Sequence, residues 1–229
     1  MKEGTAKYNP NTDRNLAISD GLFKAHVIKF ESNNLKTKDG PRVVFNLTYR
    51  VSEEAEKIAN INYFKPGQDG RAEPIMTPSR DKDGVELFNE NGDNIMVQES
   101  GSAAYMVGKR IRDNGVWFNP YPSSGKGWQN NEYRELLEVF NINIPEENGI
   151  QTLGEVEELD VLYKPCIIRI APSSYVDRNT KEKKWTMRAL NVLPWENGKE
   201  LSAKIVEKEM KKEKQEEAPF WFLNNIVKL

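Results

Sequence analysis

Two segments in which β-forming residues flank a turn lie near opposite ends of this 229-residue chain. The first covers 22–51 and turns at Lys38-Asp-Gly-Pro41, and the second covers 162–193 and turns at 179–184. Both are rich in β-branched and aromatic residues, which favour strands. Each segment predicts a long antiparallel hairpin, so a chain that carries two of them is expected to fold around a sheet.

The clearest helical pattern lies between the two hairpins, in 130–140, where Asn130 or Asn131 can cap the helix. Its apolar residues recur with the spacing of one helix face: Tyr133, Leu136, Leu137 and Phe140. Few strands with one amphipathic helix between hairpins predict a mainly β (α+β) fold. We expect a small β-barrel like the oligonucleotide/oligosaccharide-binding (OB) fold.

The domain organisation follows from weaker patterns. Residues 52–98 are predicted to be an insertion with a small hairpin over 81–93, and 102–111 is expected to be a helix, although a strand also fits. No internal repeat is expected. We predict that 1–198 form the barrel domain, and that 199–229 form a charged linker or helix with an apolar end.

Composition excludes several classes of protein. Hydrophobic residues make up 38% and charged residues 30% of the chain, which is too apolar for full disorder. No apolar run approaches the roughly 20 residues that cross a bilayer, and the start lacks the apolar core of a secretory signal. The single cysteine, Cys166, fits a reducing cytoplasm, the host's if the protein is viral. We expect no membrane association.

Charge is segregated along the chain, although the net charge is only −2. Residues 22–50 carry six bases against two acids, and 163–190 carry seven against two. Between them, 145–160 carry six acids and no base. Because an acidic segment can hide a basic face in the total, the net charge does not exclude a polyanionic ligand.

Three stretches of the chain carry a family resemblance. They are Gly21-Leu-Phe-Lys-Ala-His-Val with 36–49, the helix Glu135-Leu-Leu-Glu-Val-Phe-Asn-Ile, and Val161-Leu-Tyr-Lys-Pro-Cys-Ile-Ile-Arg-Ile with 185–194. Together they resemble phage-encoded OB-fold single-stranded DNA-binding proteins, and also an uncharacterised phage family from replication and recombination gene clusters. The resemblance covers about a third of the chain, and it implies an OB fold and a role in phage DNA replication or recombination.

Single-strand binding needs cations for the backbone and aromatic faces for the bases. We predict that two regions line one groove and that the first hairpin joins them. The alternative is that half of these aromatic residues pack in the core and do not contact DNA. The last hairpin supplies Tyr163, Lys164, Tyr175, Arg178, Lys181, Lys183, Lys184, Trp185 and Arg188. The middle stretch supplies Lys109, Arg110, Arg112, Trp117, Phe118, Tyr121, Lys126 and Trp128. The first hairpin supplies Lys36, Lys38, Arg42 and Tyr49.

Catalytic signatures are weak, and we expect no enzyme activity, cofactor or metal. Gly125-Lys126-Gly127 lacks the spacing of a phosphate-binding loop, and Asp81-Lys-Asp-Gly84 lacks the later donors of a calcium loop. The lone His26 cannot join a histidine-based site. Carboxylates at 155–160 leave a metal-dependent nuclease as a less favoured alternative.

The apolar end at Phe220, Trp221 and Phe222 is predicted to bind a replication or recombination protein, the chain's own groove, or a neighbouring copy. Completion of the chain's own core is the equally open alternative. We therefore expect a largely sequence-independent single-stranded DNA-binding protein. The rival hypothesis is a viral structural, assembly or protein-interaction module.

Overall fold

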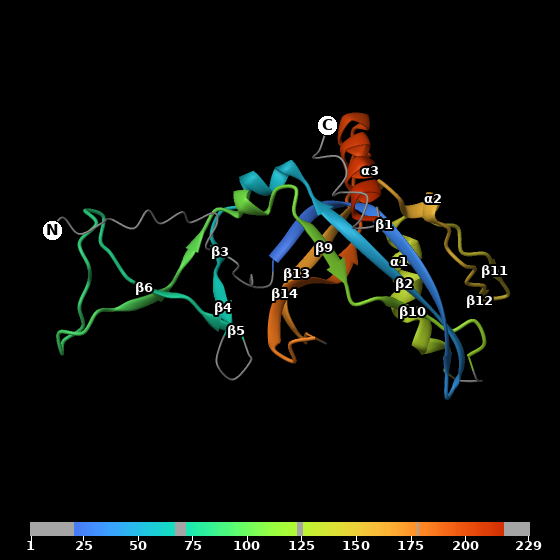
Figure 1. Cartoon of the computed structure of the whole chain (residues 1–229), viewed down its shortest axis with the longest axis horizontal. Helices are drawn as coiled ribbons and strands as arrows, with labels where there is room; N and C mark the ends of the chain where they lie inside the picture. Colours follow the sequence, from blue (N-terminus) through green and yellow to red (C-terminus); the bar gives the residue numbers. More distant parts are fainter. Residues whose placement is uncertain (1–20, 67–71, 123–125, 178, 218–229) are drawn as a thin grey trace, which may run out of the picture. The chain divides into compact units, whose positions relative to one another are not determined.

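The computed structural model describes residues 21–66, 72–122, 126–177 and 179–217. Six strands form its main sheet (Figure 1). They are β1 (Gly21–Thr37), β2 (Gly40–Val51), β9 (Arg110–Asp113), β10 (Val116–Phe118), β13 (Pro165–Val176) and β14 (Lys183–Leu193). Their order in the sheet is β1-β13-β14-β9-β2-β10, and β1 also pairs with β2. Five strands therefore close a ring, and β10 is added alongside β2.

The ring has the topology of an OB fold. Counted along the chain, β1, β2, β9, β13 and β14 are strands one to five, and around the ring they run 1-2-3-5-4-1. Strands β9 and β14 pair in parallel, with Arg112 opposite Arg188. This is the order of the five-stranded Greek-key OB barrel. The prediction of a mainly β, OB-fold-like small barrel is confirmed.

Along the long strands every second side chain is buried, and this alternation explains why these segments form a sheet with one face in the core. On β1 the predicted inward face of Phe23, Ala25 and Val27 is fully buried. The same alternation places one face of β2 and of β13 in the core: Val43, Phe45, Leu47, Tyr49, Val51, Cys166, Ile168 and Ile170. Cys166 is thus a small core residue, as expected, and burial raises the pKa of its thiol.

Contacts divide the chain into two units, and the long strands of the ring run from one into the other. Unit 1 consists of Met1–Lys24, Arg50–Asn114 and Ile167–Val192. Unit 2 consists of Ala25–Tyr49, Gly115–Cys166 and Leu193–Leu229. The expected domain boundary after residue 198 does not coincide with a boundary of these units.

The predicted helix is present in unit 2 as α1 (Asn131–Val139), preceded by the 3-10 turn η3 (Gly127–Asn130). Tyr133 is its anchor. The ring of Tyr133 lies between those of Phe45 and Phe118, at centroid distances of 5.1 and 4.5 Å, and its hydroxyl donates to the carbonyl of Gly154 at 2.6 Å. Burial raises the pKa of Tyr133 to about 12. Aromatic packing of this kind holds α1 against the sheet.

The insertion joins β2 to β9 within unit 1. Its elements are η1 (Glu53–Lys57), β3 (Ile61–Asn62), β4 (Phe64–Pro66), β5 (Ala72–Pro74), β6 (Met76–Pro78), β7 (Met96–Gln98), β8 (Ser100–Gly101) and η2 (Ala103–Met106). Strands β3, β4 and β6 pair antiparallel with β8, β5 and β7 respectively. The helix expected over 102–111 was wrong. Only the short η2 forms, because Gly108 takes a φ of +72° and the chain then enters β9.

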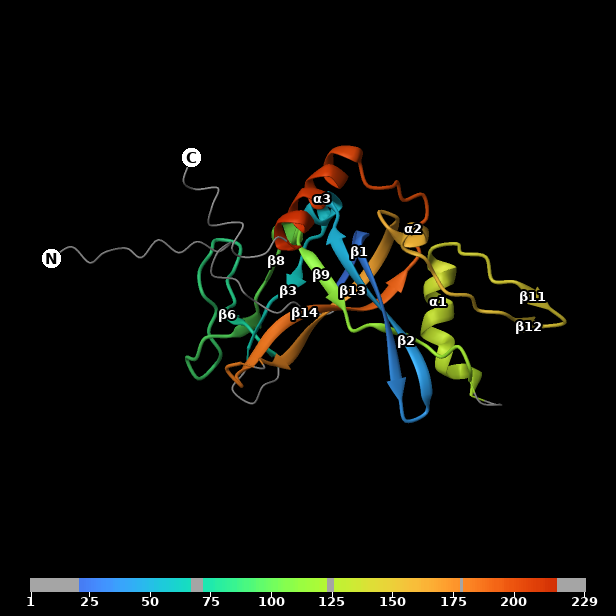
Figure 2. The same cartoon turned by 45° about the vertical axis from the view of Figure 1, so that its right-hand side comes forward.

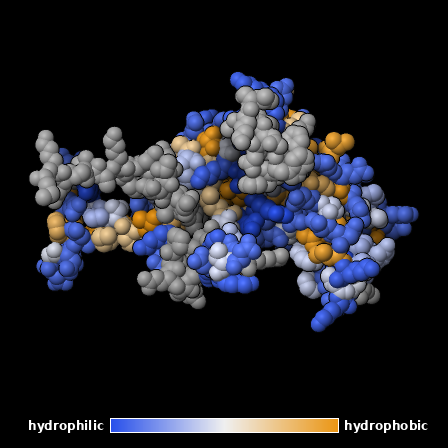
Figure 3. Space-filling model, viewed as in Figure 1, coloured by the Kyte–Doolittle hydropathy of each residue, from blue (hydrophilic) through white to orange (hydrophobic). Residues whose placement is uncertain are grey.

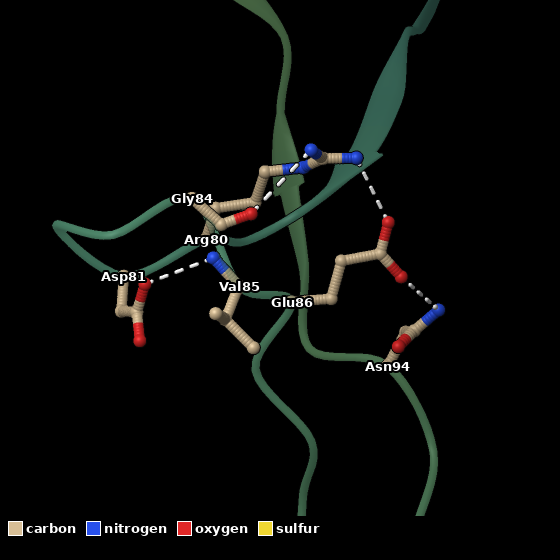
Figure 4. A network of polar contacts seen from close by, with 6 residues as sticks. All are labelled: Arg80, Asp81, Gly84, Val85, Glu86 and Asn94. Atoms are coloured by element: carbon tan, nitrogen blue, oxygen red, sulfur yellow. Dashed lines mark hydrogen bonds and ion pairs between the residues drawn. The ribbon is translucent and has the colours of Figure 1, made fainter.

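Two equivalent turns replace the single hairpin predicted over 81–93. Oδ1 of Asp81 accepts backbone N–H bonds from residues 83 and 85, and Oδ1 of Asn89 accepts them from residues 91 and 93, all at 2.9 Å. The carboxylate of Glu86 receives Arg80 at 2.9 Å and Asn94 at 3.4 Å (Figure 4). The second turn repeats the first after eight residues, so the expectation of no internal repeat was wrong.

Three segments of the chain, at Ser79, Leu87 and Ile95, meet beside these turns. The backbone N–H of Ser79 donates to Ile95, that of Ile95 to Leu87, and that of Leu87 to Ser79, at 2.7 to 2.9 Å. Each segment thus donates one backbone hydrogen bond and accepts one. The closed triangle satisfies backbone groups that a two-stranded ribbon would leave open at its edges.

The remaining elements belong to unit 2, where Figure 2 shows the long β1–β2 hairpin and α1 from a second side. They are β11 (Glu146–Glu147), β12 (Ile150–Gln151), α2 (Glu158–Val161) and α3 (Ala203–Glu217). The segment before α3 covers the outer side of β1: His26 lies 2.9 Å from the carbonyl oxygen of Lys199 and 5.5 Å from the Trp195 ring. Lys29 approaches Glu213 of α3 at 3.6 Å. No helix in the described part of the chain is long and apolar enough to cross a bilayer.

Replacement of Leu47 by alanine tests the core. The Leu47 side chain is completely buried, so L47A should lower the free energy of unfolding by about 2–5 kcal/mol. The matched control is L159A, because Leu159 is 84% exposed and its loss should change that free energy by less than about 0.5 kcal/mol. Urea unfolding followed by circular dichroism measures both. Equal effects of the two substitutions would contradict the core described above.

Candidate nucleic-acid interface

The two neighbouring aromatic residues of strand β10, Trp117 and Phe118, lie on opposite faces of the strand. Trp117 lies opposite Val44 of β2, and Phe118 lies opposite Val43. Because alternate side chains of a strand point to opposite faces, Trp117 is 44% exposed whereas Phe118 is only 4% exposed. Gly115 precedes the strand at a φ of +85°, where a Cβ would lie 2.8 Å from Val44. Glycine is therefore required for this entry.

A buried pair of asparagines fixes the segment that follows β10. The backbone N–H of Asn119 donates to Oδ1 of Asn130 at 2.8 Å, and Nδ2 of Asn130 donates to the carbonyl of Asn119 at 2.9 Å. Nη1 of Arg42 donates to Oδ1 of Asn119 at 2.8 Å, which ties the segment to β2. This Asn119–Asn130 clasp holds Tyr121 and Trp128 beside it, with 77% and 66% of their surfaces exposed.

Cations lie close in sequence to these aromatic residues. Lys126 is exposed next to the η3 turn, and Lys36 and Lys38 are exposed around the β1–β2 turn. Within the described part of the chain these three lysines form no ion pair or hydrogen bond through their side chains. Arg42, which follows the β1–β2 turn, contacts the clasp through its hydrogen bond to Asn119. Unit 2 therefore presents exposed aromatic faces and uncompensated positive charge, the two chemical groups that bind single strands.

Unit 1 carries a second group of predicted residues on β9 and β14. Arg112 is exposed, and in the parallel register it lies opposite Arg188, whose Nη1 donates to the carbonyl of Asp113 at 3.3 Å. Arg110 is two residues from Arg112 on the same strand face, whereas Ile111 between them is buried. Three guanidinium groups therefore follow the outer face of this strand pair.

The turn between β13 and β14 is held by Asp177. Its carboxylate accepts Nζ of Lys184 at 2.6 Å and the backbone N–H groups of Asn179 and Thr180 at 2.8 and 3.2 Å. The hydrogen bond from Lys184, with the two backbone bonds, lowers the pKa of Asp177 to about 2, and the same contact raises the pKa of Lys184. Lys184 thus stabilises the turn. Lys181 and Lys183 are exposed on the turn, and Tyr175 near it is 46% exposed.

Several residues predicted to contact DNA lie in surroundings that exclude or disfavour that contact. Tyr49 and Phe118 are core residues, 0% and 4% exposed, so stacking on a base is excluded for both. Lys109 lies 4.8 Å from the centre of the Tyr105 ring, and burial lowers its pKa. Burial also raises the pKa of Tyr163, and three glutamates add to that shift, which makes its surroundings unfavourable for phosphate. Its neighbour in the sequence, Lys164, is half-buried.

Other predicted residues cannot be placed in this way. Arg178 and the terminal Phe220, Trp221 and Phe222 lie outside the described residues, as does the side chain of Trp185. The remaining candidates fall into the two units: Lys36, Lys38, Arg42, Trp117, Tyr121, Lys126 and Trp128 in unit 2, and Arg110, Arg112, Tyr175, Lys181, Lys183 and Arg188 in unit 1. A single groove lined by both sets stays a prediction, because its members belong to two separate units.

Two features were not predicted from the sequence. One is a cavity of about 370 Å³ beside the clasp, to which Arg134 of α1 contributes. The other is the apolar surface of the insertion, part of which is visible at the left of Figure 3. Its exposed members are Met76, Val85, Leu87, Phe88, Ile95, Met96 and Val97. Residues 72–101 also carry seven acids against two bases, so this surface is unsuited to a polyanion. In the sequence, the available signal for this surface was the Asx-turn pattern, which recurs after eight residues.

Among the described residues, no group of three or more histidine, cysteine, aspartate or glutamate side chains is arranged to hold a metal ion. Comparison of the chain with protein-family models, with curated proteins and with solved structures found no match. The function is therefore inferred from the chemistry of the two groups of residues described above.

The Asp177 turn should open in acid. A carboxylate whose pKa is about 2 in the folded state and near 4 when unfolded stabilises the turn above pH 4 and loses that effect as the pH falls toward 2. We expect the amide resonances of Asn179 and Thr180 to shift together through that window in NMR spectra, and D177N to abolish the transition. A midpoint near pH 4 in the wild type would contradict the bonding described here.

Proposed function

We propose that this protein binds single-stranded DNA with little dependence on sequence, through cationic contacts to the backbone and aromatic stacking on the bases, and that it acts without catalysis. The observation that carries the proposal is the segment around the Asn119–Asn130 clasp. There Trp117, Tyr121 and Trp128 are exposed near the hydrogen bonds of the clasp, in the same unit as Lys126. Exposed aromatic rings offer flat faces, and bases are planar ligands that stack on them.

The OB topology supports the same conclusion. In this fold the face of strands two and three and the loops between strands one and two and between strands four and five contact oligonucleotides. In this chain those two loops are the β1–β2 turn, with Lys36 and Lys38, and the β13–β14 turn, with Lys181 and Lys183. The fold alone would be an argument by analogy. Here the loops also carry exposed positive charge, which is what the phosphate backbone requires.

The proposed biological setting is phage DNA replication or recombination in a host cytoplasm, where such a protein protects or organises single strands. The resemblance to phage-encoded OB-fold proteins supports this setting. A second candidate, a protein-interaction or assembly module, is favoured by the exposed apolar residues that are gathered in the insertion. The two roles occupy different surfaces, so one chain can perform both.

Charge reversal at the two turns tests the proposal. K36E/K38E and K181E/K183E should each weaken binding of a fluorescent oligo-dT, and should lower the steepness of log K against log salt by about 1.4 for the two contacts removed. The matched control is K204E/K208E, the same charge change on exposed positions of α3. Fluorescence anisotropy at several salt concentrations measures all three.

The same titration separates the alternatives. Wild-type protein that leaves the oligonucleotide free at low salt would contradict DNA binding and favour the interaction module. Degradation of the oligonucleotide after magnesium is added would indicate the nuclease instead. Equal losses in the turn variants and in the control would show a general effect of charge rather than a site.

Alanine substitution tests the stacking contacts. W128A and Y121A should each weaken oligo-dT binding by about 1–3 kcal/mol, because each removes one aromatic platform, whereas W128F should retain most of the affinity. F88A is the matched control, since Phe88 is also exposed, at 58%, but lies on the insertion. Unchanged affinity in W128A and Y121A, measured by the same anisotropy titration, would move the stacking site elsewhere.

A further inference from the structure

A cavity in unit 2 lies against the Asn119–Asn130 clasp. Its volume is about 370 Å³, within the range of roughly 300–1,000 Å³ typical of small-ligand pockets. Residues from three segments line it: 118–122 at the end of β10 and beyond, 127–134 in η3 and the start of α1, and 151–153 at the end of β12 and beyond. In both cartoon views the β11–β12 hairpin lies on the same side of the unit as α1 (Figures 1 and 2).

The lining combines flat apolar walls with a few polar groups. Phe118, Pro120, Pro122 and Leu153 supply the apolar surface. One wall is fixed in advance, because Asn119 and Asn130 are both buried and bonded to each other. A pocket with a rigid wall costs little conformational entropy to occupy.

Arg134 supplies the main hydrogen-bonding capacity of the cavity. Its Nη1 donates to Glu138, one turn along α1, at 2.8 Å, and its side chain is 38% exposed. Exposed pairs of this kind are weak, so the guanidinium can turn to a ligand at small cost. The amide of Gln151, which donates to Glu146 at 3.3 Å, and the hydroxyl of Thr152 complete the polar groups.

We propose that this cavity accepts one unpaired base of the bound strand, and that guanine fits it best. The inference rests on the proposed function and adds a base preference at one position. Glu138 and Glu146 lie beside the polar groups, so a phosphate is disfavoured there and a neutral base is favoured. The planar fork of arginine matches the O6 and N7 acceptors of guanine, which is the commonest arginine–base contact. Pro120, Pro122 and Leu153 supply apolar surface for the faces of the ring.

The test compares two labelled oligonucleotides of equal length, all thymidine and thymidine with one central dG. The wild type should bind the dG oligonucleotide about five- to tenfold more tightly, and dA or dC at the same place should give a smaller gain. R134K keeps the positive charge but loses the fork. It should abolish the preference and leave the affinity for the thymidine strand within about twofold.

Two further variants sharpen the comparison. E138Q removes the negative charge that competes for Arg134 and should keep the dG preference. L153W fills the cavity and should abolish the preference. Circular dichroism and thermal unfolding establish that each variant folds. Should L153W fail to fold, R134K and E138Q still decide the question, because both positions are partly exposed on α1.

The outcomes separate this inference from the proposed function. Equal and tight binding of both oligonucleotides by the wild type would overturn the base pocket and leave single-strand binding intact. No binding of either would overturn both. A dG preference that survives in R134K, or a stronger preference for dA or dC, would overturn the assignment to Arg134 and guanine. Binding of free dGMP without binding of the strands would show a nucleotide site of another kind.

Discussion

The parallel pairing of β9 with β14 is the constraint on which the rest of the fold depends. Without it the two hairpins would still be joined through β1 and β13, but the sheet would stay open and leave unpaired edges at β9 and β14. The pairing joins a strand that follows the insertion to the last strand of the ring, and it closes the ring in the OB order. Because the ring closes in that order, the β1–β2 and β13–β14 turns become the loops that OB folds use for ligands.

The charge of this protein is best understood segment by segment. A net charge of −2 would argue against a polyanionic ligand if it were evenly spread. The acids are instead concentrated in 145–160 and in the insertion, whereas bases occupy the two turns and the outer face of β9 and β14. Since charges beyond about 10 Å are screened at physiological salt, the local surface governs the encounter with DNA more than the total does.

Exposed aromatic residues give the candidate site its chemical character, and the backbone decides which ones are exposed. Trp117 and Phe118 are neighbours in the sequence, yet one faces solvent and the other packs on Tyr133. The choice is made by the register of β10 on β2, since a shift of one residue would exchange the two side chains. Gly115 and the Asn119–Asn130 clasp hold that register at the two ends of the strand.

Local patterns in the sequence were enough to predict the hairpins, helix α1 and the basic turns, because alternation and helical spacing are properties of neighbouring residues. They could not separate Tyr49 from Tyr121, or Lys184 from Lys181, since burial and ion pairing depend on what lies opposite in space. The η2 turn and the triangle of Ser79, Leu87 and Ile95 likewise depend on long-range backbone bonds. The sequence by itself therefore determined the β character and the segregation of charge. Only the tertiary structure decided which of those groups reach solvent, because strand register and ring closure join residues far apart in the chain.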